Sequence, residues 1–215
     1  MSNISIKKFT FNSFQENTYV IYNENRHAFI FDPGCSDAKE ENILFQFIER
    51  QDLHPIALIN THCHIDHVLG NYSVKERYDI PFWAPDGEQV VLKAAPVMSQ
   101  MYQIPYQSSP DPDEWIDTNH DMSLDGEDWQ IMLAPGHSPA SLVFYLPSAK
   151  IAIAGDVLFR DSIGRTDLPG GNHQELLKNI RDKLYVLPEK TVIYPGHGPE
   201  TTIGYEKKNN PFVKG

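Results

Sequence analysis

The chain of 215 residues is poor in cysteine, poor in basic residues and without long apolar runs. Its 2 cysteines, Cys35 and Cys63, are too few for a disulfide framework. Against 29 Asp and Glu stand only 18 Lys and Arg, so the formal net charge is −11, which opposes binding to phosphate backbones and anionic lipid surfaces. We therefore expect neither a nucleic-acid partner nor a membrane partner.

The beginning of the chain has no features of a targeting segment. The opening tract MSNISIKKFTFNSF contains no apolar stretch of the roughly 7–15 residues found in a secretory signal. No apolar run approaches the ~18 residues of a membrane-spanning helix. We expect a cytoplasmic protein and, at this length, a single domain over residues 1–215.

Apolar patterning predicts the same plan twice along the chain, strands followed by helices. Two halves of this kind indicate an α/β fold with two sheets packed face to face and helices outside. In the first half we expect strands at 4–11, 18–22, 27–31 and 56–60, helices at 37–50, 68–78 and 85–101, and a loop at 102–117. In the second half we expect strands at 120–124, 129–134, 142–146, 151–154 and 191–194, and a helix at 173–184.

The tract THCHIDH contains four potential metal ligands directly after an apolar strand: His62, His64, Asp66 and His67. In extended backbone, residues i and i+2 point the same way, so His62 and His64 can hold one ion. As the chain turns into a helix, Asp66 and His67 can face a second ion. Imidazole together with carboxylate suits zinc, iron or manganese and differs from the all-oxygen sites of calcium and magnesium. Without a cation, this crowded loop would be destabilised by desolvation.

Three further candidate ligands follow predicted strands in the second half, each directly after a glycine. His137 lies in APGHSP, Asp156 in AIAGDVLF and His197 in YPGHGP. Glycine permits a sharp turn, so each side chain can be aimed back over the sheet edge. Asp156 has two oxygens and is the natural bridge between two cations. The expected division is His62, His64 and His137 on metal one, and Asp66, His67 and His197 on metal two.

The motif series THCHIDH, GHSP, GD and GHG, in this order, resembles that of the metallo-β-lactamase superfamily over nearly the whole chain. The resemblance implies a four-layer αβ/βα sandwich with two mixed β-sheets, helices outside and a dinuclear site at one edge. The antibiotic-cleaving zinc members of the family carry a cysteine where this chain has Asp156. The resemblance therefore argues against β-lactam hydrolysis.

Within that superfamily, the stretch GDVLFRDSIGRTDLPGG at 155–171, the tract YPGHGPETT and the closing NNPF are most similar to the short bacterial glyoxalase II group. Those enzymes hydrolyse S-acyl glutathione thioesters. In them a basic residue after a glycine in this loop binds the glycine carboxylate of glutathione, and Arg165 matches that position. Glyoxalase II has an aromatic hydroxyl where Asp167 stands, so Arg165 and Asp167 would alternatively pair with each other and brace the loop.

The resemblance thus implies a hydrolase of small-molecule thioesters such as S-lactoylglutathione, with two divalent ions, zinc in preference to iron or manganese. A water between the ions would become the nucleophile, because bound metal lowers the pKa of water towards about 7. Asp66 is the expected catalytic residue, steering the proton of this water. Arg165, with Lys207 or Lys208 from the last helix, is expected to bind an anionic end of the substrate.

Other functions remain open at the level of sequence. The persulfide dioxygenases resemble this chain too, including the GRTD tract, and would use one iron held by His62, His137 and Asp156. A lactonase fits the dinuclear ligands equally well. In a non-catalytic metal-binding domain the ions would only hold the fold together, but structural zinc sites are usually closed by four ligands, many of them cysteine.

Overall fold

The structure, a computed structural model, describes residues 4–215, so positions 1–3 of the expected domain lie outside the described residues. The chain forms two compact units. The first comprises Met1–Ala84 and Gln89–Ile116, and the second comprises Pro85–Glu88 and Asp117–Gly215. The expectation of a single domain stays a prediction.

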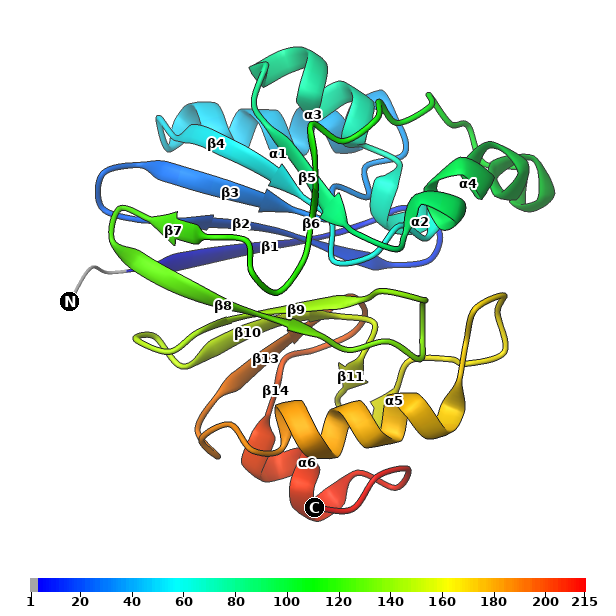
Figure 1. Cartoon of the computed structure of the whole chain (residues 1–215). Coiled ribbons are helices and arrows are strands. Elements are labelled where there is room, and N and C mark those ends of the chain that lie inside the picture. Colours follow the sequence, from blue (N-terminus) through cyan, green and yellow to red (C-terminus); the bar gives the residue numbers. More distant parts are fainter. Residues whose placement is uncertain (1–3) are drawn as a thin grey trace. The chain divides into compact units, whose positions relative to one another are not determined.

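The first unit is built on a six-stranded mixed sheet in the order β1-β2-β3-β4-β5-β6 (Figure 1). The first three strands pair antiparallel, whereas β3, β4 and β5 run parallel. The strands are β1 (Ser5–Phe11), β2 (Glu16–Tyr22), β3 (His27–Phe31), β4 (His54–Ile59), β5 (Phe82–Pro85) and β6 (Glu114–Ile116), and the helices are α1 (Ala38–Arg50), α2 (Ile65–Val68), α3 (Asn71–Tyr78) and α4 (Gln89–Tyr102).

Helix α1 connects the parallel strands β3 and β4. Its first turn is capped by Asp37, whose carboxylate accepts hydrogen bonds from the backbone N–H groups of Lys39 and Glu40. Leu44 and Ile48, four residues apart on one helix face, are buried in the core of this unit. This packing holds β4 beside β3, so that the residues after β4 emerge at the end of the sheet.

The second unit contains a six-stranded mixed sheet in the order β14-β13-β10-β9-β8-β7, in which β10 and β13 are parallel. A separate two-stranded sheet pairs β11 with β12. The strands are β7 (Met122–Leu124), β8 (Glu127–Leu133), β9 (Leu142–Leu146), β10 (Ile151–Gly155), β11 (Leu158–Phe159), β12 (Ser162–Ile163), β13 (Val192–Pro195) and β14 (Thr201–Thr202). The helices are α5 (His173–Asn179), the π-helical turn η1 (Ile180–Leu184) and α6 (Ile203–Asn209).

Helix α5 begins after Asn172, whose side chain accepts a hydrogen bond from the N–H of Glu175. Leu176 and Ile180, which share a helix face, are buried in the core of the second unit together with Ala152 of β10. Figure 1 shows α5 running along one face of this sheet. The helix thereby supports the strand ends that carry the second-half motifs.

The α/β fold with two mixed sheets is confirmed, and the strands at 27–31 and 142–146 and the helix at 173–184 have the predicted bounds. The helix expected at 68–78 is instead two helices, and α2 begins inside the ligand tract at Ile65. Strand β5 was not predicted, because its four residues, which follow Pro81 and end with Pro85, give too short an apolar pattern. The predicted loop 102–117 contains the short strand β6, and the helix expected from 85 begins at Gln89.

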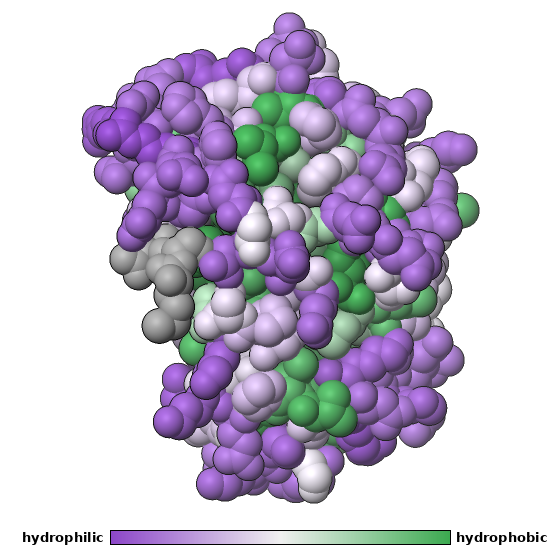
Figure 2. All heavy atoms as spheres, turned by 60° about the vertical axis from the view of Figure 1, so that its left-hand side comes forward, coloured by the Kyte–Doolittle hydropathy of each residue, from purple (hydrophilic) through white to green (hydrophobic). Residues whose placement is uncertain are grey.

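Between residues 4 and 215, no helix has both the length and the apolar character needed to cross a membrane. On the face drawn in Figure 2, hydrophilic side chains predominate and hydrophobic ones occur in small separate patches. The buried apolar residues instead form the core of each unit.

Candidate metal centre

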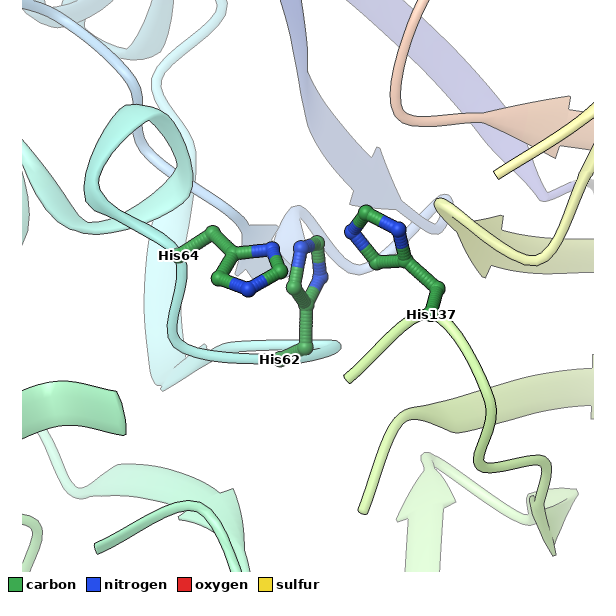
Figure 3. Close-up of side chains that lie close together, drawn as sticks. All are labelled: His62, His64 and His137. Atoms are coloured by element: carbon green, nitrogen blue, oxygen red, sulfur yellow. The ribbon is translucent and has the colours of Figure 1, made fainter. Parts of the chain in front are cut away.

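The first predicted ligand cluster lies in the loop and short helix after β4. Figure 3 shows His62 and His64 on this loop. The ring centroid of His62 lies 4.8 Å from that of His64 and 4.2 Å from that of His67. The Nε2 atom of His67 lies 3.7 Å from Oδ2 of Asp66. The first unit therefore brings all four candidate ligands of THCHIDH together.

Asp32, which directly follows β3, holds this loop through hydrogen bonds to Thr61. Its carboxylate accepts hydrogen bonds from the backbone N–H of Thr61 at 2.7 Å and from the Thr61 hydroxyl at 2.6 Å. The same carboxylate lies 3.1 Å from Nδ1 of His67, and the Thr61 hydroxyl lies 3.2 Å from Nδ1 of His62. Nδ1 of each ring thus faces a protein oxygen, the arrangement in which the other ring nitrogen, Nε2, is the candidate metal donor.

Glu16, the first residue of β2, is a second buried acid beside His67. Its Oε1 lies 3.9 Å from Nδ1 of His67, and its Oε2 accepts a hydrogen bond from the Thr18 hydroxyl at 3.0 Å. Burial raises the pKa of the Glu16 carboxyl well above its ordinary value.

The second cluster is formed by His137, Asp156 and His197 at three strand ends of the second unit. Figure 3 shows His137 on the loop after β8. The Oδ2 atom of Asp156 lies 3.4 Å from Nε2 of His137 and 3.5 Å from Nε2 of His197. Donor atoms bound to zinc at about 2.0–2.2 Å in a tetrahedron lie roughly 3.3–3.6 Å apart. The spacing of these donors therefore fits metal ligands, with Asp156 between two histidines.

The orientation of His137 has a clear local cause. Its Nδ1–H donates a hydrogen bond to the carbonyl of Arg165 at 2.8 Å, which directs Nε2 towards Asp156. The preceding Gly136 has φ 128°, and Gly155 before Asp156 has φ 46°, backbone conformations that favour glycine. The sharp turns expected from these two glycines are present.

The residues expected to bind substrate belong to two segments of the second unit, the loop after β12 and helix α6. Arg165 forms a bidentate pair with Asp167, with both N–O distances 2.8 Å, so the predicted alternative pairing is present. The hydrogen bond from Arg165 lowers the pKa of Asp167 to about 2. On α6, Lys207 is half-buried and Lys208 exposed, and the Lys207 carbonyl accepts a hydrogen bond from the N–H of Gly215 at 3.3 Å.

Four polar residues that hold the ligand loops were missed in the sequence: Asp32, Thr61, Glu88 and Ser138. Glu88 and Ser138 are fully buried and hydrogen-bonded to each other. Asp32 and Glu88 follow the ends of β3 and β5, and a charged residue in that place is a weak signal. Their partners lie 29 and 50 residues away in the sequence, so local patterning could not reveal them.

Two mixed sheets with histidine and aspartate clusters at their strand ends define a metal-dependent α/β enzyme. A family model described as the metallo-β-lactamase superfamily matches residues 12–197, which include every candidate ligand. The chain belongs to the metallo-β-lactamase superfamily and is a metallo-hydrolase of that class. The recognition of this family from its motifs is confirmed.

Known relatives are similar over almost the full chain. The hydroxyacylglutathione hydrolase GloC of Haemophilus influenzae is 36% identical over 203 residues, which are 94% of this chain and 94% of that protein. A crystal structure of the B3 metallo-β-lactamase BLEG-1 is 36% identical with a TM-score of 0.90, covering 98% of this chain and 100% of that one. The protein TTHA1623, solved in a di-iron-bound form, is 32% identical with a TM-score of 0.86, covering 96% and 100%.

Proposed function

We propose that the chain is a dinuclear metal-dependent hydrolase of glutathione thioesters such as S-lactoylglutathione. The observation that carries the dinuclear assignment is Asp156, whose Oδ2 lies 3.4 Å from Nε2 of His137 and 3.5 Å from Nε2 of His197. A carboxylate between two histidine nitrogens suits a ligand shared by two ions. The substrate class is supported by the 36% identity with the hydroxyacylglutathione hydrolase GloC.

Two divalent ions would supply Lewis-acid chemistry, activating a water molecule and polarising the thioester carbonyl. Imidazole and carboxylate donors accommodate zinc, iron or manganese. We propose zinc, with iron as the alternative because TTHA1623 has been solved with two irons. In this proposal metal one is held by His62, His64 and His137, metal two by Asp66, His67 and His197, and Asp156 is shared.

Side chains of the protein would then direct the proton of the water and bind the substrate. The Asp66 carboxylate is proposed to steer the proton of the water, and the Asp66 backbone carbonyl accepts a hydrogen bond from Nδ2 of Asn12 at 3.1 Å. Arg165 is proposed to bind a carboxylate of the glutathione moiety. Lys207 and Lys208 are proposed to add positive charge for the same anionic group. A thiolate is a good leaving group, so the reaction needs no separate general acid.

The test is elemental analysis of protein purified without added metal, combined with turnover of S-lactoylglutathione by the same sample. About two metal equivalents per chain with thioester hydrolysis are expected. Two equivalents without hydrolysis of any S-acyl glutathione would overturn the substrate class and leave the dinuclear site standing. One equivalent or none would overturn the dinuclear site.

Competing activities are separated by further assays on the same sample. Oxygen consumption with glutathione persulfide and about one equivalent of iron would identify a mononuclear persulfide dioxygenase. The convergence of His67 Nε2 on Asp66 Oδ2, at 3.7 Å, instead favours a second ion. Hydrolysis of an acylated lactone would identify a lactonase. Similarity to BLEG-1 makes a β-lactam substrate a necessary control.

The rest of the proposal concerns the domain organisation, the location and the partners of the protein. We propose a single domain that works in the cytoplasm on small molecules, without nucleic-acid or membrane partners. The net charge of −11 supports this restriction, because it repels polyanions. A non-catalytic metal-binding domain would show bound metal with none of the activities above.

A further inference from the structure

Glu88 is a fully buried carboxylate on the segment between β5 and α4. The hydroxyl of Ser138, which is also fully buried, donates to this carboxylate and lies 2.6 Å from Oε1 and 2.7 Å from Oε2. The backbone N–H of Ala140 donates to Oε1 at 2.8 Å. Both donors belong to the loop after β8, and they lie one and three residues beyond His137.

A buried carboxylate is unfavourable unless hydrogen bonds replace its lost hydration. Charge-assisted hydrogen bonds of this length are stronger than bonds between neutral groups. The loop therefore cannot move away from Glu88 without leaving a buried charge unsatisfied. The backbone next to Glu88 also packs closely against this loop, since a Cβ added to Gly87 would lie 2.8 Å from the Cβ of Ala140.

The other side of the same loop is held by backbone groups. The Gly136 carbonyl accepts a hydrogen bond from the N–H of Asn172 at 2.8 Å, and the Arg165 carbonyl accepts one from Nδ1 of His137. Neither contact reaches the backbone of residues 138–140. Within the loop, the Ser138 carbonyl accepts a hydrogen bond from the N–H of Gly136 at 3.2 Å. Glu88 adds hydrogen bonds from outside the loop, to Ser138 and Ala140 directly beyond the imidazole.

We infer that Glu88 is a positioning residue for His137. By binding Ser138 and Ala140, it fixes the backbone that presents the imidazole and so tunes the affinity for the ion that His137 holds. The inference rests on the proposed function, in which His137 is a ligand of metal one. Glu88 itself would touch neither metal nor substrate.

The test is a competition titration of metal-free protein with Zn²⁺ against a chromophoric chelator, which resolves two dissociation constants. In Glu88→Ala one constant is expected to rise about 10–100-fold while the other stays unchanged, the range typical of residues that orient metal ligands. Glu88→Gln keeps an acceptor for Ala140 N–H and can donate to Ser138, so it is expected to restore most of the lost affinity.

Glu206 provides a matched control for the loss of a buried carboxylate. It is fully buried in the same unit and accepts hydrogen bonds from the Asp161 backbone N–H, the Thr201 hydroxyl and Nδ2 of Asn210. None of these partners is a proposed ligand. Glu206→Ala is expected to lower the melting temperature as Glu88→Ala does and to leave both Zn²⁺ constants unchanged.

If Glu88→Ala does not fold, Ser138→Ala removes one of the two donors and is expected to weaken the same Zn²⁺ constant to a smaller extent. The inference would be overturned, and the proposed function left intact, if both Zn²⁺ dissociation constants of Glu88→Ala equalled those of the wild type. If Glu88→Ala does not fold, the same outcome in Ser138→Ala would overturn it. An equal loss in Glu206→Ala would also overturn it, by assigning the effect to stability. Wild-type protein that binds no Zn²⁺ would overturn the proposed zinc centre, and with it the inference.

Discussion

At the scale of the residue, two imidazole rings of the candidate metal centre are oriented by contacts that their Nδ1 atoms make with protein oxygens. Nδ1 of His137 donates to the Arg165 carbonyl at 2.8 Å, and Nδ1 of His67 lies 3.1 Å from the Asp32 carboxylate. Contacts of this kind orient the rings, and the Arg165 carbonyl, which can only accept, requires the His137 proton to be on Nδ1. Arg165 contributes twice to the site, because its carbonyl orients His137 while its guanidinium pairs with Asp167.

The Arg165–Asp167 pair yields a prediction about substrate binding. In Asp167→Asn the guanidinium loses its anionic partner and becomes available to a substrate carboxylate. The KM for S-lactoylglutathione is expected to fall about two- to fivefold, the scale of an exposed ion pair, with little change in kcat. Asp182→Asn, which removes an exposed partner of Lys178 elsewhere in the same unit, is the control. An unchanged KM would mean that the pair only braces the loop.

The same pair yields a prediction about pH. The hydrogen bond from Arg165 lowers the pKa of Asp167 from an ordinary value near 3.8 to about 2. Since the folded-state pKa is lowered, the pair stabilises the protein above about pH 4, and this contribution is lost as the pH falls through 2. In Arg165→Gln, NMR titration of carboxyl carbons is expected to show the pKa of Asp167 raised from about 2 towards 3.8. A titration unchanged by that substitution would contradict the assigned cause.

At the scale of the element, the candidate ligands share one design, a strand end followed by a tight turn. His62 follows β4, His137 follows β8, Asp156 follows β10 and His197 follows β13. Strands held in a sheet are rigid, so the loops that follow them can present ligands in fixed positions. One of these turns, at Gly136, packs closely against Leu176 of α5.

Gly136 yields a prediction about stability. Its φ is 128°, and an added Cβ would lie 2.4 Å from the backbone N of Leu176. Gly136→Ala is expected to lower the free energy of unfolding by more than about 2 kcal/mol, because backbone strain and overpacking add. Urea unfolding measures this loss. In Gly126→Ala, where φ is 88° and no heavy atom lies within 4 Å of the added Cβ, only the strain remains and the loss is expected to be smaller.

The sequence predicted the longer helices and strands better than the short ones. Strand β3 and the helix at 173–184 have the predicted bounds, because apolar spacing reports directly on which face of an element is buried. Strand β5 escaped prediction, since its four residues form no period. The split of the 68–78 segment into α2 and α3 depends on packing around the ligand tract, which periodicity does not express.

At the scale of the whole molecule, the chain combines a net charge of −11 with seven candidate ligands for cations. Each proposed ion would be held by residues far apart in the sequence. Bound metal would therefore stabilise the folded chain, since the unfolded chain cannot offer the same ligands together. This coupling would add to the stabilisation by the apolar cores of the two units.

Metal removal is the prediction at this scale. Dialysis against a chelator is expected to abolish thioester hydrolysis and to lower the melting temperature, because metal at about 1,000 times its dissociation constant stabilises a fold by about 4 kcal/mol. Addition of Zn²⁺ is expected to restore both. Calorimetry with and without chelator provides the measurement. A melting temperature insensitive to chelator would contradict tight binding at the proposed site.

The sequence by itself determined the kinds of ligand, their order along the chain and the α/β plan, because motifs and apolar periods are local properties. Only the tertiary structure decided which oxygens orient the histidines. Asp32 meets Thr61 and His67 because β3 and β4 are parallel neighbours, and Glu88 meets Ser138 across 50 residues. These contacts depend on how distant segments pack, and no local pattern records that packing. The pairing of Arg165 with Asp167, left open by the sequence, was likewise decided by the conformation of its loop.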